Sequence, residues 1–173
     1  GKLLGITELG PSAGLNLTLQ ATATATITLD NAHPSAWLRS RDLINLGNIA
    51  LTGNASTLTH LWLDAASISN QGGFAIDNDS TDNLRIDCVT TDCGSMTNAA
   101  GATLTLNDLN GIIAIGSELA AFNNEGLVDL QQGCGAIGAQ GVDTGTWRYA
   151  GSCTLWFNPR PDTERVLQAS AIL

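Results

Sequence analysis

Apolar and polar residues alternate in short stretches along this chain, and a recurring polar corner separates the stretches. Four times an apolar residue, one further residue and an asparagine are followed by a glycine two or three positions later. The copies are LINLGNIAL (43–51), ISNQGGFAI (68–76), MTNAAGATLTL (96–106) and FNNEGLVDL (122–130). Their asparagines are 25, 28 and 26 residues apart: Asn45, Asn70, Asn98 and Asn124. A period of this length, with strand-like residues after each glycine, is typical of a β-solenoid.

The polar corners predict how successive coils contact one another. Asparagine and glycine tolerate the left-handed backbone that other residues resist, so each Asn-x-Gly is expected to turn a corner. The alternating apolar residues after the corner then point into a shared core. Stacking the coils brings the four asparagines together, and we expect a ladder in which each side-chain amide bonds to the next.

A second strand follows in each coil. Apolar-rich segments at 58–63, 83–87 and 112–115 begin 13, 13 and 14 residues after the asparagines, and turn-forming residues separate them from the first strands. The pattern predicts an all-β, single-domain parallel β-solenoid of about four coils of about 26 residues, with capped ends. A β-sandwich, pilin-like subunit is the alternative fold.

These repeats resemble the β-helices of bacterial surface proteins, such as filamentous-haemagglutinin-like and autotransporter passenger repeats. The resemblance covers about half of the chain. It implies a right-handed coil and a secreted protein at the cell surface.

Residues 15–29 carry the strongest strand pattern. The apolar positions are Leu15, Leu17, Leu19, Ala21, Ala23, Ala25, Ile27 and Leu29, alternating mostly with threonine. Fifteen extended residues span about 50 Å, so this strand must bend or run beyond its own domain. It suits a first-coil strand, or a strand donated to a neighbouring subunit. A third reading, a water-ordering threonine array similar to ice-binding β-solenoids, needs T-x-T rows on consecutive coils, and we expect the later coils not to repeat T-x-T at the same phase.

The chain divides into four parts on these patterns. Residues 1–30 form an N-terminal arm with the long strand, and 31–42 form a cap or loop, in which Pro34 suits either a short helix or an irregular segment. Residues 43–130 form the coils. Residues 131–173 form a C-terminal cap, with a hairpin of 146–149 and 154–157, and an apolar tail.

The charge balance excludes several partners. Charged residues make up 13% of the chain, the net charge is −9, and Lys2 is the single lysine beside six arginines. No basic stripe is present to meet nucleic acid or an anionic membrane surface. No apolar run approaches the ~20 residues of a membrane helix, so membrane insertion is not expected. Because the sequence begins at Gly1, we interpret it as a mature, processed form.

The even number of cysteines predicts two local disulfides. Their spacing favours the pairs Cys88–Cys93 and Cys134–Cys153, with other pairings open. A four-cysteine zinc site is the rival, but the C-x2-C spacing typical of such sites is absent. Disulfides imply an oxidising compartment.

The most acidic turn offers a possible metal site. Asp77, Asp79 and Asp82 have spacing that resembles part of a calcium loop, although a solvated turn between strands explains them as well. No other cofactor is expected.

The sequence gives little support for a catalytic site. Aspartates 64, 77, 87, 108 and 129 recur about once per coil, which indicates strand ends rather than the paired carboxylates of glycan-cleaving β-helix enzymes. His33 and His60 have no G-x-S-x-G companion. The four tryptophans, at 37, 62, 147 and 156, serve either as core or interface anchors or as sugar-stacking surfaces. We therefore expect no enzyme.

The predicted function is structural. We expect a non-enzymatic extracellular subunit that assembles with copies of itself into a filament or surface layer, through strand donation and end-to-end β-stacking. A carbohydrate-binding adhesin module that uses a tryptophan-lined face around Trp147 is the alternative, with surface glycans as partners. A glycan-cleaving enzyme is the further alternative.

Overall fold

The structure, a computed structural model, describes most of the chain. The described residues are 2–4, 17–19, 22–32, 34–54, 56, 58–79, 82–87, 94–115, 119–150, 155–157 and 165–167. Within them the chain forms strands and no helix, and the strands are β1 (Lys2–Leu4), β2 (Leu17–Leu19), β3 (Thr24–Leu29), β4 (Ser35–Asn45), β5 (Asn48–Gly53), β6 (Thr59–Asn70), β7 (Gly73–Asn78), β8 (Leu84–Asp87), β9 (Ser95–Asn98), β10 (Thr103–Ile115), β11 (Ala121–Asn124), β12 (Leu127–Ile137), β13 (Gly141–Asp143), β14 (Thr146–Tyr149), β15 (Leu155–Phe157) and β16 (Arg165–Leu167).

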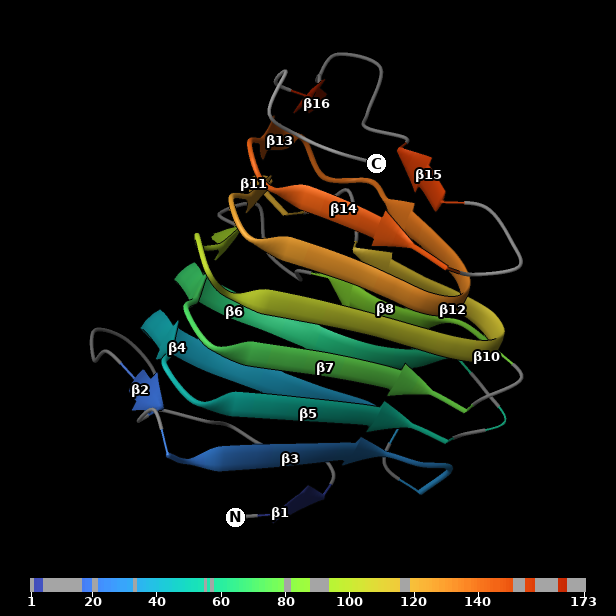
Figure 1. The fold of residues 1–173 in the computed structure, drawn as a ribbon. Helices are drawn as coiled ribbons and strands as arrows, with labels where there is room; N and C mark the ends of the chain where they lie inside the picture. The colour runs from blue at the N-terminus through green and yellow to red at the C-terminus, as the bar shows by residue number, and fades with distance from the viewer. Residues whose placement is uncertain are drawn as a thin grey trace.

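The strands wind into a parallel β-solenoid whose coils stack from the N-terminal to the C-terminal end (Figure 1). Each full coil has three strand positions. The first side stacks β1, β3, β5, β7, β10, β12 and β14. The second stacks β4, β6, β8, β10, β12 and β15. The third stacks β2, β4, β6, β9, β11, β13 and β16.

The sequence pattern indicated two strands in each coil, whereas the structure has three strand positions. Four long strands account for the difference. β4, β6, β10 and β12 each bend around a corner and contribute to two sides of the coil. The solenoid fold is confirmed, while its right-handedness stays a prediction from the resemblance.

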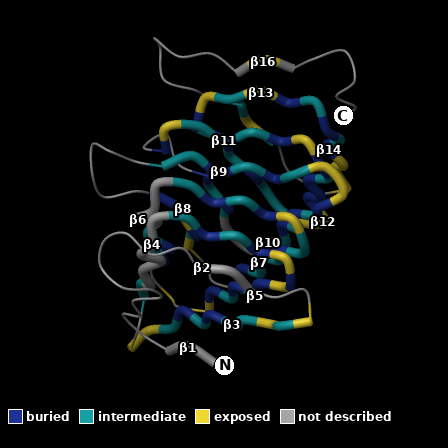
Figure 2. The backbone as a smooth tube through the Cα atoms, turned by 90° about the vertical axis from the view of Figure 1, so that its left-hand side faces the viewer, coloured by how far each residue is buried: buried dark blue, intermediate teal, exposed yellow. Residues whose placement is uncertain are grey.

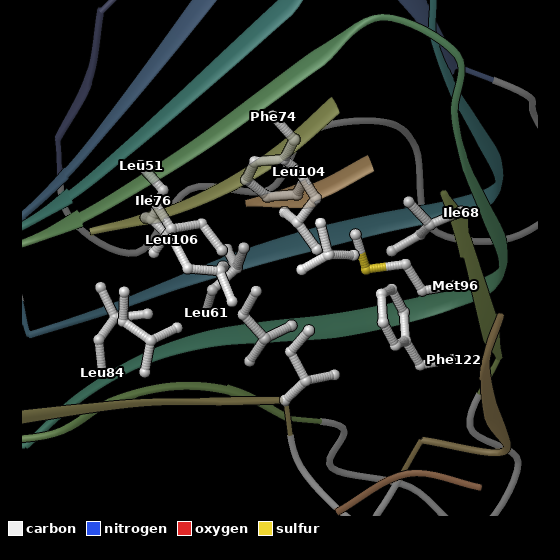
Figure 3. Packing of buried hydrophobic residues seen from close by; sticks show 14 of the residues in the cluster. Leu51, Leu61, Ile68, Phe74, Ile76, Leu84, Met96, Leu104, Leu106 and Phe122 are labelled. Carbon is white, nitrogen blue, oxygen red and sulfur yellow. The ribbon is translucent and has the colours of Figure 1, made fainter. Parts of the chain in front are cut away.

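The core follows from the period-two alternation. Along the first side, one inward position is occupied in successive coils by an apolar residue, and all but the last are buried: Ile27, Leu51, Ile76, Leu106, Leu130 and Tyr149. Leu61, Ile86, Ile115 and Ile137 form such a column on the second side. Figure 3 shows side chains from the different sides meeting in one cluster. Each fully buried leucine or isoleucine stabilises the fold by roughly 1.5–3 kcal/mol.

The solenoid extends beyond the predicted range of 43–130. Residues 35–42, expected as a cap or loop, belong to β4, because the chain after Pro34 is extended and pairs in parallel with β6. The predicted hairpin is also wrong. β14 and β15 both pair in parallel with β12 and lie on different sides, since the coil period continues past residue 130.

The long alternating segment bends, as its length required. Part of it forms β2 on the third side and part forms β3 on the first side, while Leu15 and Ala21 lie outside the described residues. β3 pairs with β1 on one edge and with β5 on the other. Residues 24–29 therefore act as a strand of the chain's own solenoid, and neither edge of β3 is open for donation.

The T-x-T pattern of β3 recurs in one later coil and not in every coil. Register places Thr103 and Thr105 in the columns of Thr24 and Thr26, so one later coil does repeat T-x-T at the same phase. Asn48, Ala50, Gly73 and Ala75 occupy those columns in the two coils between. The continuous array that the water-ordering reading needs is absent from these coils.

Within the described residues, no helix is long and apolar enough to cross a membrane.

Candidate functional site

A ladder of asparagine side chains runs along one corner of the solenoid. Asn45 Nδ2 donates to Asn70 Oδ1 at 2.8 Å, and Asn70 Nδ2 donates to Asn98 Oδ1 at 2.9 Å. Asn98 Nδ2 then donates to Asn124 Oδ1 at 2.9 Å. The second amide hydrogens reach backbone carbonyls beyond the corner, those of Gly73, Thr103, Leu127 and Thr146. All four asparagines are buried, and the predicted ladder is confirmed.

The ladder has two different ends, which sequence reasoning missed. Register places Leu19 before Asn45, and Asp143 and then Leu167 after Asn124. Asp143 begins a fifth copy of the corner, Asp-Thr-Gly-Thr, in which aspartate replaces asparagine. A carboxyl group has no N–H to donate, so Asp143 cannot pass on the amide-to-amide pattern of the ladder. The D-x-G sequence was the available signal, but Asp143 follows Asn124 by 19 residues rather than by the 25 to 28 of the other corners, so the period did not predict it.

The corner glycines are required for two different reasons. Gly101 has φ +82°, in the left-handed region that the corner motif predicted. Gly72 and Gly145 instead lie against the previous coil, where an added Cβ would come within 2.1 Å of Gly47 O and 2.2 Å of Gly126 O, respectively. Most corners thus need glycine for close stacking of the backbones rather than for unusual φ angles.

A shorter polar column occupies another corner. Register places Gly53, Asn78 and Asp108 in successive coils, and both polar side chains are buried. Asn78 Nδ2 donates to the carbonyl of Asp82 at 2.9 Å and holds the turn after β7. Asn78 also belongs to an N-x-S sequence, but its burial closes it to modification.

The predicted calcium group does not form among the described residues. Asp77 Oδ1 accepts a hydrogen bond from Asn107 Nδ2 at 3.0 Å on the neighbouring coil. Asp79 and Asp82 are exposed, and Asp82 Oδ1 accepts from the following backbone N–H, that of Asn83. No three acidic, histidine or cysteine side chains in the described ranges gather so as to hold a metal ion. Asp77 therefore bonds between neighbouring strands, and Asp82 bonds within the turn after β7.

The buried aspartates of the described residues occupy different register positions around the coil: Asp87, Asp108, Asp129 and Asp143. A hollow of about 620 Å³ lies beside the corner at Gly101, Gly126 and Gly145, with Glu125 as the one ionisable side chain among its described lining residues. Two-carboxylate sugar chemistry has no matching geometry at this hollow.

One ion pair joins the last two coils on the first side. The Arg148 guanidinium donates to both oxygens of Asp129, from Nε at 2.6 Å and from Nη2 at 2.5 Å. The Asp129 side chain is 3% exposed and that of Arg148 is 61% exposed. The hydrogen bond from Arg148 lowers the pKa of Asp129 below its usual range, against the opposing effect of burial.

The tryptophans take different roles. Trp147 is 2% exposed and packs edge-on against Phe122 and Phe157, so it belongs to the core and cannot serve as a sugar-binding surface. Trp62 lies on the outer surface of the second side with its ring stacked on His60, and Trp156 is 42% exposed on β15. The tryptophan side chains described outside the core are therefore Trp62 and Trp156, both on the second side, while the side chain of Trp37 lies outside the description.

The cysteine pairs cannot be assigned within the described residues. Cys134, in β12, is the one cysteine among them and is not a free thiol. Cys88, Cys93 and Cys153 lie outside the described residues. Both predicted pairings stay predictions.

Exposed apolar side chains gather at the C-terminal end. Of the five large hydrophobic side chains exposed in the described residues, four lie in the last strands: Val142, Tyr149, Trp156 and Val166. Figure 2 shows exposed positions confined mainly to turns in the middle coils, where inward positions are buried. Tyr149 is the exception, because it occupies the inward column of Leu130 yet is 41% exposed.

Compared with known proteins, the chain matches no protein-family model, no curated protein and no solved structure. The β-solenoid that the sequence resemblance implied is present. The resemblance to filamentous-haemagglutinin-like and autotransporter passenger repeats is one of the corner motif, and no family is identified for the chain.

Proposed function

We propose that this chain is a non-enzymatic structural subunit that stacks end to end with copies of itself in an extracellular filament or surface layer. The observation that carries the proposal is Tyr149, an inward core position that is 41% exposed on the last strand of the first side. Part of the apolar core is therefore exposed to solvent at the last strand of the first side. An exposed apolar surface of this kind marks a contact with a partner.

Open strand edges supply the second part of the argument. Within the described residues, β1 pairs only with β3 and β2 only with β4, while β14 pairs only with β12 and β16 only with β13. Such edges present unpaired backbone N–H and C=O groups to another parallel strand. A contact between unlike ends does not close on itself, so it propagates into a filament.

The residues at the two ends are compatible. Leu3 occupies the column that ends at Tyr149, and Leu19 occupies the ladder column that ends at Leu167. Stacking the C-terminal end of one copy on the N-terminal end of the next would continue both columns with apolar residues. The proposed contact joins β14 and β16 of one copy to β1 and β2 of the next. Both edges of β3 are already paired, so strand donation by β3 is not part of the proposal.

Electron microscopy of the purified chain in negative stain tests the proposal. We expect filaments of constant width whose number rises with salt, because a net charge of −9 per subunit opposes association until it is screened. Tyr149→Asp should leave a folded monomer, whereas Thr97→Asp, on the third side in the middle of the stack, should still assemble. Single particles of the unaltered chain at every protein and salt concentration would refute end-to-end assembly.

A further inference from the structure

The second side of the solenoid carries a cationic and an aromatic side chain in one straight column. Register places His60, Arg85, Ala114, Ala136 and Trp156 at equivalent outward positions in successive coils. At the usual strand spacing of about 4.8 Å, the Cα atoms of Arg85 and Trp156 are about 14 Å apart. Only the methyl groups of two alanines lie between them in this column, so the two long side chains flank a low, apolar floor.

Arg85 stands out because its charge is not used within the described part of the chain. Two arginine side chains are described, and Arg148 binds Asp129. Arg85 is exposed and has no ion pair with another described residue. Asp87, two residues further along β8, is 8% exposed and therefore presents little of its carboxylate to a ligand on this surface.

His60 makes the neighbouring part of the surface rigid and uncharged. Its ring stacks on Trp62, with the ring centroids 4.4 Å apart and the planes within 2° of parallel. Burial, and then the Arg85 guanidinium, lower the pKa of His60, so the imidazole is neutral at neutral pH. A neutral imidazole still offers one hydrogen-bond donor and one acceptor.

We propose that this column, which we call the Arg85–Trp156 surface, binds an acidic polysaccharide that carries sugar carboxylates. The planar guanidinium of Arg85 matches a carboxylate with two parallel hydrogen bonds. The indole of Trp156 offers an aromatic surface to the apolar face of a sugar ring further along the same oligosaccharide. The alanine floor lets the chain of sugars lie flat across β10 and β12 between the two contacts.

The overall negative charge does not forbid such a ligand. At an ionic strength of 0.15 M the Debye length is about 8 Å, so exposed charges on the other sides of the coil are largely screened. Among the described side chains of this column, Arg85 carries the exposed charge that a ligand meets. The inference does not depend on end-to-end assembly, because the column faces outward from the second side of the coil. Of its residues only Trp156 lies on an end strand, β15.

The test uses trigalacturonic acid as the probe and isothermal titration calorimetry as the readout, on the folded Tyr149→Asp variant and on the unaltered chain. We expect saturable binding that Arg85→Gln weakens by roughly tenfold or more, as loss of a charge-assisted bidentate pair requires. Trp156→Ala should weaken it several-fold. Arg148→Gln, which removes the arginine of the first side, is the matched control and should bind as the unaltered chain does.

Two results would overturn the inference. One is absence of measurable binding of trigalacturonic acid at millimolar concentration by the chain that circular dichroism shows to be folded. The other is binding that persists in Arg85→Gln, or that trigalactose, which lacks the carboxylates, reproduces with equal affinity. Binding by the Tyr149→Asp variant without filaments in the unaltered chain would support this surface while contradicting the proposed assembly.

Discussion

At the scale of single residues, the asparagine ladder sets the register of the coils. Each central asparagine accepts one hydrogen bond from the coil before and donates two to the coil after, in a corner from which water is excluded. Slipping one strand by a residue would break these bonds and turn the apolar residues outward. The ladder therefore specifies the alignment of coils as well as stabilising it.

Removing one member of the ladder should be costly. In Asn98→Ala, the amide of Asn70 loses its acceptor and Asn124 Oδ1 loses its donor, both while buried. We expect the free energy of unfolding to fall by about 3 kcal/mol, because each unsatisfied buried polar group costs roughly 1–3 kcal/mol. Thr97→Ala, one residue earlier on the outer surface, is the control and should change it by less than about 1 kcal/mol. Urea denaturation of both variants measures the difference, and equal stability would show that the ladder contributes little.

At the scale of strands and coils, the sequence pattern predicted the middle of the chain better than its ends. The corners at Asn45, Asn70, Asn98 and Asn124 identified the fold and the ladder because asparagine, glycine and apolar alternation all repeat at one spacing. The fifth corner was missed because Asp143 replaces the asparagine and follows Asn124 by 19 residues rather than by 25 to 28. Residues 35–42 were missed because their pairing with β6 is set by the neighbouring coil rather than by local preference.

The surface side chains were harder to predict. Trp147 and Trp156 are nine residues apart in similar strand patterns, but one faces the core and the other faces solvent. Which face a strand residue occupies depends on where the coil bends between β14 and β15, and the sequence pattern does not fix that point. Likewise, Arg85 and Trp156 can be assigned to one column only when the register of three successive strand pairings is known.

The ion pair between β12 and β14 predicts an acid sensitivity of the last coil. The lowered pKa of Asp129 means that its pairing with Arg148 stabilises the fold above the unfolded-state pKa of about 3.9 and is lost as the pH falls through the lower, folded-state pKa. Arg148→Gln should therefore lower stability at pH 6 and lower it less at pH 2. Because Arg148 is largely exposed, salt should reduce the difference.

Denaturation of both chains at the two pH values, with Arg85→Gln as the control arginine variant, measures this effect. An equal loss of stability from Arg148→Gln at pH 2 and at pH 6 would mean that packing of the arginine stem, rather than its charge, holds β14 on β12.

At the scale of the whole molecule, the solenoid is uniform along its length and differs at its two ends. The middle coils are closed by the core and by the ladder, while Tyr149, at an inward position, exposes apolar surface on the last described strand of the first side. The ladder column begins at Leu19 and ends at Leu167, so neither end presents a buried asparagine without a neighbour. The molecule is thus suited to stacking through apolar ends, with its three sides left for other contacts.

The measurement that tests this account most directly is a cross-link between copies. In a head-to-tail stack, Leu3 of one copy lies next to Tyr149 of another at about the strand spacing of 4.8 Å, within the Cα separation that a disulfide spans. The double variant Leu3→Cys, Tyr149→Cys should give a regular series of covalent dimers, trimers and longer species on mild oxidation. The pair Leu3→Cys, Thr97→Cys should not. If the first pair stays monomeric under conditions in which both thiols are accessible, the ends do not meet and the proposed assembly is wrong.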